Sequence, residues 1–191
     1  MIFPELDGPI RQILRGNILL MICCVFYLAW WLLAFKPAGA IKGIKSGWLL
    51  IPAAVAGVAA IYFTVGGIGD AEPARALFPA MYIIVGGIAA YVILLVVTLG
   101  LFKRPVTTEL ILIVGWAVMA LCEINVLYGT GTLARTAALV FMAIIVIAVL
   151  ISLVCYVLYY KLDSRMGYYD GMVPLLMAGL VTAAMTAGIF I

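Results

Sequence analysis

Glu123 is the residue of this sequence whose type and setting most clearly invite chemistry. It lies inside a long apolar stretch, about five residues before the aromatic Tyr128 that marks the end of that stretch. A carboxylate within a membrane costs on the order of 2–3 kcal/mol even on a lenient insertion scale, so it needs a partner, a cavity or a proton. Intramembrane carboxylates commonly mark ion or substrate pathways. We therefore expect Glu123 to bind an ion or a substrate.

Four further polar residues extend this candidate site. Asn125 follows Glu123 by two positions, which places it on a different face of a helix. Arg15, Arg75 and Arg135 are spaced sixty residues apart, and each opens an apolar stretch on the same side as Glu123. Their long side chains predict a polar vestibule, with Glu123 at its floor and the arginines around its mouth. The alternative is structural: an ion pair that fastens Glu123 to a neighbouring helix.

Other kinds of chemistry find little support in the sequence. The chain has no histidine, which excludes imidazole metal ligands, bis-histidine haem and Ser-His or Cys-His pairs. Its four cysteines form no C-x-x-C, and no P-loop, G-x-S-x-G or H-E-x-x-H motif occurs. We expect no metal and no cofactor. Enzyme activity is the least favoured class, because one buried carboxylate gives little scope for acid–base catalysis.

The composition identifies the surroundings in which these residues lie. Of the 191 residues, 68% are apolar and 10% are charged, and the mean hydropathy is +1.32. Soluble domains are about 45–50% apolar and about 25% charged. The net charge of +3 is small and scattered, which argues against nucleic acid as a partner. The sequence therefore predicts an all-α polytopic membrane protein with the lipid bilayer around it.

Hydropathy predicts six transmembrane helices, since about 20 apolar residues are needed to cross the hydrocarbon core. The predicted spans are 18–35, 47–65, 79–101, 108–128, 136–159 and 171–191. Residues 1–17 are predicted to form an amphipathic interfacial segment, followed by a single transmembrane domain over 18–191. Acidic residues stand where a secretory signal carries basic ones, so the first span is expected to be an uncleaved anchor.

The equal arginine spacing also predicts an internal repeat. Three tandem parallel helical hairpins would lie near residues 15–65, 75–128 and 135–191. Each descending helix ends in an aromatic residue followed by lysine, as in Phe35-Lys36. The alternative explanation is that aromatic residues and lysines gather at any membrane interface without common ancestry.

The basic residues predict an orientation. The loops after the first, third and fifth spans carry seven lysines and arginines, and the opposite side carries four. The seven are Lys36, Lys42, Lys45, Lys103, Arg104, Lys161 and Arg165. Because basic loops stay in the cytoplasm, we expect a multi-pass protein of the plasma membrane with both termini outside.

Small residues and loops complete the sequence picture. Ala53, Ala56, Gly57 and Ala60 mark one face of the second span, which predicts close packing in the interior of the bundle. In the sixth span, a face with Gly179, Ala183 and Ala187 likewise predicts close packing in the interior of the bundle. The bulkier fifth span is predicted to be peripheral. Residues 66–73 are predicted to form a flexible turn, and residues 163–170 a solvated loop.

Two functions are favoured over an enzyme. The first is a small transporter or channel that moves an ion or small solute, with Glu123 as the coupling or selectivity group. The alternative is a non-catalytic membrane-anchor or assembly subunit of a larger complex. The short loops favour the alternative, because helix faces are then available to a second copy of the chain or to partner membrane subunits.

Overall fold

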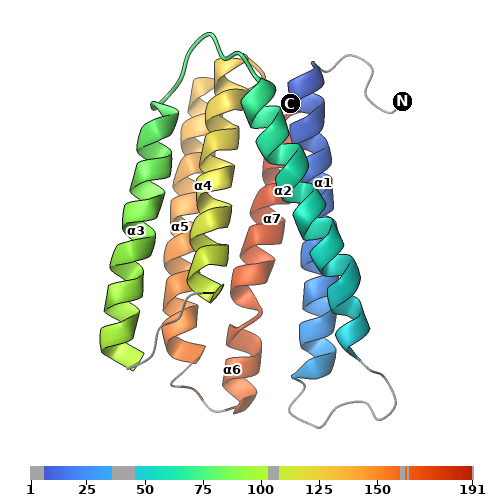
Figure 1. Cartoon of the computed structure of the whole chain (residues 1–191), viewed down its shortest axis with the longest axis vertical. Coiled ribbons are helices and arrows are strands. Elements are labelled where there is room, and N and C mark those ends of the chain that lie inside the picture. The colour runs from blue at the N-terminus through green and yellow to red at the C-terminus, as the bar shows by residue number, and fades with distance from the viewer. Residues whose placement is uncertain (1–6, 36–45, 103–107, 160–161, 163, 191) are drawn as a thin grey trace. The chain divides into compact units, whose positions relative to one another are not determined.

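The computed structural model describes residues 7–35, 46–102, 108–159, 162 and 164–190. These residues are helical throughout, apart from short connections, and include no strand. The elements are α1 (Gly8–Ala34), η1 (Ser46–Leu49), α2 (Leu50–Asp70), α3 (Ala80–Phe102), α4 (Thr108–Gly129), α5 (Arg135–Tyr159), α6 (Ser164–Asp170) and α7 (Val173–Gly188) (Figure 1). Six helical stretches are long and apolar enough to cross a membrane, which confirms the all-α class and the predicted number of spans.

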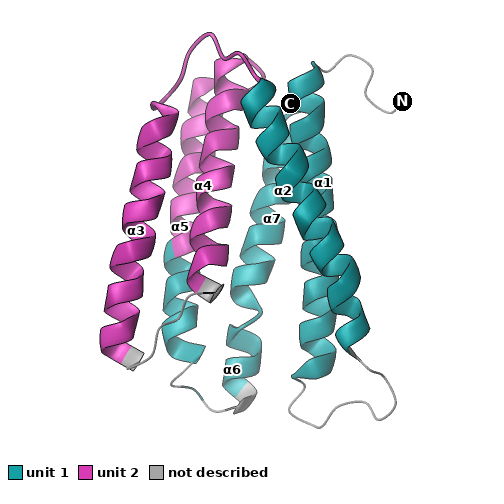
Figure 2. Ribbon diagram, viewed as in Figure 1, with its two compact units in different colours: residues 1–70, 150–191 teal, residues 71–149 magenta. Residues whose placement is uncertain are grey.

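The helices are divided between two compact units (Figure 2). Unit 1 comprises residues 1–70 and 150–191, and unit 2 comprises residues 71–149. Within unit 1, the start of α1 and the end of α7 lie at the same end (Figure 1).

Most of the loop charges that predict the orientation lie outside the described residues, namely Lys36, Lys42, Lys45, Lys103, Arg104 and Lys161. The orientation and the hairpin repeat therefore remain predictions.

The first helix is longer than the sequence predicts. Residues 8–17 are the opening turns of α1, which continues without interruption to Ala34. Pro9 stands in the first turn, where its missing N–H costs no hydrogen bond. Ile10, Ile13 and Leu14 are fully buried, so this part of the chain contributes packing to unit 1. The predicted interfacial segment and the first span thus form one helix, and residues 1–6 lie outside the described residues.

Close packing of α1 against α2 holds unit 1 together. The buried residues of α2 recur every three or four positions and are Ala53, Ala56, Ala60, Thr64 and Gly67. A methyl group on Gly16 of α1 would collide with the Thr64 hydroxyl and lie 2.9 Å from the Thr64 backbone nitrogen. The two backbones can approach this closely because small residues line the seam. The small-residue face predicted for the second span is therefore a packing face.

The sixth span is interrupted rather than continuous. Residues 164–170, predicted as a solvated loop, form the short helix α6, and α7 begins after a turn at Gly171 and Met172. Pro174 lies in the first turn of α7 and has no N–H for the carbonyl four residues earlier, which accounts for the interruption. A candidate span of 23 residues, Met166–Gly188, results from the two helices together.

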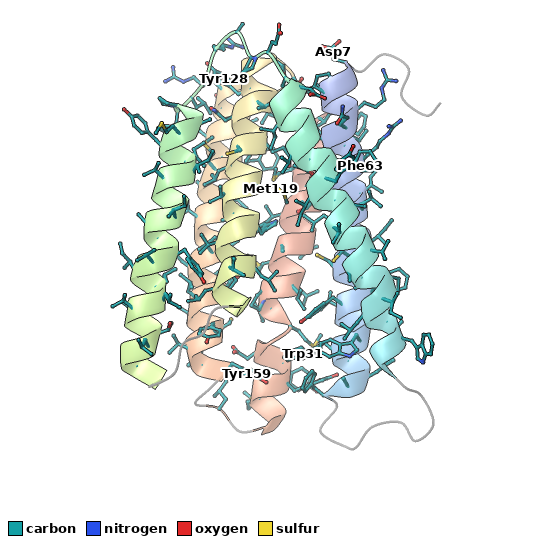
Figure 3. All side chains as sticks on the ribbon, viewed as in Figure 1. Asp7, Trp31, Phe63, Met119, Tyr128 and Tyr159 are labelled. Atoms are coloured by element: carbon teal, nitrogen blue, oxygen red, sulfur yellow. The ribbon has the colours of Figure 1, made fainter. Side chains whose placement is uncertain are left out.

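Trp31 of α1 stabilises the turn between α6 and α7. Its indole Nε1 donates a 3.1 Å hydrogen bond to the Tyr168 carbonyl, and the Tyr168 hydroxyl donates to the Leu32 carbonyl at 3.3 Å. The indole lies against Gly171, where any larger residue would collide with it. Trp31 also neighbours Tyr159, with ring centroids 6.0 Å apart (Figure 3). These contacts stabilise the break where the backbone hydrogen bonds of a continuous helix are missing.

In unit 2, α3 packs on α4 at one close contact, where Gly87 leaves room for the side chain of Val118. Most other α3 side chains are exposed, although the helix is strongly apolar. The fifth span, predicted to be peripheral, is the helix α5, which buries one face and exposes bulky side chains elsewhere. Its buried residues follow one face, namely Ala138, Met142, Ile145, Ala148, Ser152 and Cys155. Of the bulky residues that suggested lipid contact, Ile145 lies on this buried face, whereas Ile147, Leu150 and Ile151 are exposed.

Candidate functional site

The end of α4 is the most enclosed part of the six candidate spans. Every residue from 122 to 127 is buried, so a turn and a half of this helix is covered on all sides. Glu123 is 2% exposed and Asn125 is 6% exposed. A buried carboxylate and a buried amide in so apolar a setting require specific partners, because an unsatisfied buried polar group costs about 1–3 kcal/mol. The two residues meet this requirement differently.

Asn125 is bound to the loop between α2 and α3, residues 71–79. Its Oδ1 accepts hydrogen bonds from the backbone N–H of Leu77 at 2.8 Å and of Phe78 at 3.3 Å. Its Nδ2 donates to the Phe78 carbonyl at 2.9 Å. Both lone pairs of the amide oxygen are therefore occupied by the protein itself. The geometry gives Asn125 a positioning role, holding the loop on α4.

Two further contacts fix the same loop. Gly129, the last residue of α4, lies directly under Pro73 and the Arg75 carbonyl, and a side chain at this position would collide with both. The Arg75 guanidinium stands over the Tyr128 ring, 4.6 Å from its centroid, as a cation–π contact. The flexible turn predicted for 66–73 is therefore corrected: residues 66–70 complete α2, and the loop that follows is fastened to α4.

Helix register separates Asn125 from Glu123. Asn125 lies seven residues after Val118, so both project from the side of α4 that contacts α3 and the 71–79 loop. Glu123 lies about 160° around the helix from Asn125 at 100° per residue. Trp116, seven residues before Glu123, shares the Glu123 side. We refer to this second side as the Trp116–Glu123 face.

The sequence reasoning singled out Glu123 but missed Trp116. The seven-residue spacing was the available signal, because it is two helical turns. Trp116 is the ninth residue of α4, near the middle of its 22 residues, and its indole Nε1 is buried with no hydrogen-bond acceptor among the described residues. Met119, four residues before Glu123, lies on the same side of the helix.

The three arginines occupy different positions relative to the helices. Arg15 is the eighth residue of α1, Arg75 lies in the loop five residues before α3 begins, and Arg135 is the first residue of α5. All three side chains are exposed, whereas Glu123 is buried. Arg75 and Arg135 belong to unit 2 with Glu123, and Arg15 belongs to unit 1. The structure brings Arg75 to Tyr128, and the vestibule of arginines around Glu123 stays a prediction.

Glu123 differs from the other charged side chains described in unit 2 because it is buried. The other charged side chains described there are Glu72, Arg75 and Arg135, and all three are exposed. In the described part of the chain, no three His, Cys, Asp or Glu side chains gather as metal ligands. Comparison of the sequence and structure with family models, curated proteins and solved structures finds no match. The groups at this site that could take part in chemistry are therefore a carboxylate and an indole N–H donor, both buried and on one helix face.

Proposed function

We propose that this chain is a multi-pass protein of the plasma membrane that works as a small transporter or channel for an ion or small solute. Glu123 serves as its coupling or selectivity group. The supporting observation is the 2% exposure of Glu123 within a mostly apolar helix. Both termini face outside, in agreement with the positive-inside rule and with α1 beginning where α7 ends in unit 1.

The energetics of burial favour a functional carboxylate over a structural one. Burying an ion pair costs desolvation that its attraction repays only in part, and a well-packed apolar pair of similar volume is often as stable. Packing in unit 2 is already supplied by apolar contacts such as Gly87 with Val118 and by the Asn125 hydrogen bonds. A carboxylate buried within an apolar span is the type of group that marks ion and proton pathways in membrane proteins.

The proposal is tested by flux in liposomes containing the purified chain. Wild-type protein is compared with Glu123→Gln, which keeps the shape of the side chain and removes its charge. Glu72→Gln is the matched control, because Glu72 is an exposed glutamate of the same unit. Dyes or electrodes report H⁺, Na⁺, K⁺ and Cl⁻, and light scattering reports the entry of neutral solutes. We expect at least one species to move through wild-type protein and the control, and not through Glu123→Gln.

A folding control makes the result decisive. Each variant is checked by size-exclusion chromatography and thermal unfolding before reconstitution. If Glu123→Gln is destabilised, Glu123→Asp is measured as well, since it retains the charge in a shorter side chain. A folded Glu123→Gln that carries the same flux as wild type, or a wild-type protein that moves no species, contradicts the proposal.

A second candidate function is supported by α3. This helix exposes large apolar side chains around most of its surface, including Met81, Val92 and Leu101. A membrane-anchor or assembly subunit would cover such a surface with a partner helix or a second copy of the chain, and a transporter with lipid. Stoichiometric partner chains co-purifying at native expression, together with no flux from the purified chain, would favour this alternative.

A further inference from the structure

The turn between α6 and α7 lacks the backbone hydrogen bonds that would make the two helices one. Met172 donates to the Tyr169 carbonyl at 3.1 Å, three residues back rather than four. Pro174 has no N–H to donate, so the Asp170 carbonyl receives no bond from the position four residues later. Sharp bends in helices occur mostly where a proline interrupts these bonds. The turn can therefore serve as a hinge between α6 and α7.

Contacts with α1 hold α6 in place. The Trp31 indole donates to the Tyr168 carbonyl at 3.1 Å, and the Tyr168 hydroxyl donates to the Leu32 carbonyl at 3.3 Å. The other side of α6 is open, because Met166 and Tyr169 are 57% and 58% exposed. The helix is thus attached along one side, and two hydrogen bonds to the end of α1 fix its position.

The contact of α6 with α5 is less favourable. The Cys155 thiol of α5 forms a hydrogen bond with the Asp170 side chain, and Gly167, almost one turn earlier in α6, lies against Tyr159. Oδ2 of Asp170 is nevertheless enclosed and has no hydrogen-bond partner among the described residues. An enclosed carboxylate oxygen loses its bonds to water, and leaving it unpaired is costly. The observed position of α6 therefore carries a cost that water would relieve.

We propose that α6 is a hinged flap, which turns about Gly171 and Met172 and opens to admit water to Asp170 and Cys155. Trp31 holds the flap closed, because its indole must give up its hydrogen bond when α6 moves away. Opening in turn gives Oδ2 of Asp170 water as a partner. These two effects oppose each other, so the closed and open forms are close in free energy and exchange with one another.

The flap controls the access of water to one end of unit 1. Cys155 is 9% exposed while α6 lies against it, and opening uncovers its thiol together with the Asp170 carboxylate. The hinge, the flap and Trp31 all belong to unit 1, whereas Glu123 belongs to unit 2. The inference therefore goes beyond the proposed transport function and does not depend on it, and its tests need no flux.

The Cys155 thiol reports opening without an added probe. The purified chain in nanodiscs is treated with iodoacetamide, and mass spectrometry gives the alkylation rate at each of its four cysteines. Wild type is compared with Trp31→Phe, which removes the donor to α6, and with Trp48→Phe, a control at an indole that is 70% exposed in η1. We expect the Cys155 rate to rise about fivefold in Trp31→Phe, as for the loss of one hydrogen bond, and to be unchanged in the control.

Cys24 distinguishes opening of the flap from unfolding of the unit. It is 6% exposed and lies beside Gly179 of α7, so movement of α6 alone leaves it covered. We expect its alkylation rate to be the same in wild type and Trp31→Phe. Equal increases at Cys24 and Cys155, or an unchanged Cys155 rate in folded Trp31→Phe, would overturn the flap. If Trp31→Phe does not fold, Tyr168→Phe removes the hydroxyl that donates to α1 and gives the same test.

Hydrogen exchange tests the part played by Asp170. The Trp31 indole N–H exchanges with deuterated water only when its bond to the Tyr168 carbonyl is broken, and NMR of ¹⁵N-tryptophan-labelled protein follows this exchange. Asp170→Ala removes the enclosed oxygen, so we expect exchange about threefold to tenfold slower than in wild type. Asp7→Ala, at an exposed aspartate that makes no side-chain cap hydrogen bond, is the matched control and should exchange at the wild-type rate. Exchange in Asp170→Ala as fast as in the control would overturn the role of Asp170 in opening the flap.

Discussion

The side-chain amide of Asn125 pairs with both backbone groups of Phe78, accepting from its N–H at 3.3 Å and donating to its carbonyl at 2.9 Å. One side chain of α4 thus satisfies backbone groups that a non-helical segment leaves unpaired. The Leu77 N–H, at 2.8 Å from the same oxygen, adds a third bond. This arrangement explains how a loop of nine residues, 71–79, is held against the end of an apolar helix without secondary structure of its own.

Replacing Asn125 by leucine is expected to destabilise the protein. The change leaves two N–H groups and one carbonyl of the loop without partners, at a cost of about 2–4 kcal/mol in the free energy of unfolding. Unfolding in mixed detergent micelles measures this value. Glu72→Ala, an exposed change in the same loop, is expected to have little effect. Equal stability of Asn125→Leu and wild type would show that these hydrogen bonds do not hold the loop.

The close packing of α1 on α2 predicts that replacing Gly16 by alanine costs stability, whereas replacing Gly115 does not. Gly16→Ala places a methyl group against the Thr64 hydroxyl and 3.0 Å from the Ala60 carbonyl oxygen, so the helices must move apart. We expect a loss of about 1–3 kcal/mol in unfolding free energy. Gly115→Ala, on an exposed part of α4 with open space around it, should be neutral or stabilising by up to about 1 kcal/mol. Similar effects of the two variants would refute the close packing at Gly16.

Trp31 and Gly171 are expected to depend on each other. Gly171→Ala would bring a methyl group to 2.9 Å from the indole Cη2, so the indole must leave its place and its bond to Tyr168 is lost. We expect a cost of about 1–3 kcal/mol. Trp31→Phe should cost about 1 kcal/mol through the lost hydrogen bond, and should lessen the effect of Gly171→Ala, because the smaller ring leaves room. Additive effects of the two changes in unfolding experiments would contradict this contact.

The cation–π contact between Arg75 and Tyr128 is measurable by a double-mutant cycle. Arg75→Gln and Tyr128→Leu, separately and together, are expected to show a coupling of about 0.5–1 kcal/mol in unfolding free energy. Tyr128→Phe retains an aromatic face and should retain most of the coupling. A coupling near zero would mean that Arg75 does not hold the loop by this contact.

Periodicity and hydropathy predicted much of the architecture. The six apolar stretches correspond to helices, because each apolar residue in such a run favours burial in lipid or protein whichever neighbour it meets. The small-residue face of α2 was also predictable, since a four-residue spacing of alanine and glycine suits a close helix contact. By contrast, the interfacial segment and the first span were predicted separately, whereas one helix, Gly8–Ala34, contains residues of both. Arg11 and Arg15 interrupt the apolar run but do not interrupt the helix, which needs only backbone hydrogen bonds to continue.

The site was predictable only in part. Glu123 was evident as the one charge inside a span, but Trp116 was missed, because its place on the same side of α4 depends on helix register rather than on a local motif. The role of Asn125 could not be foreseen, because its partners are backbone atoms of Leu77 and Phe78, nearly fifty residues earlier in the chain. Polar side chains that bind distant backbone leave no pattern in sequence. Trp31 with Tyr168 is a second example, because the partners are 137 positions apart in the chain.

The central claim is that Glu123 lies on the path of the transported species. The most direct measurement is the initial rate of flux through Glu123→Gln relative to Glu72→Gln, at equal amounts of folded protein per liposome. Loss of the coupling carboxylate is expected to reduce the rate to that of protein-free liposomes, at least a ~100-fold decrease for a group essential to transfer. Equal rates in the two variants would contradict the claim.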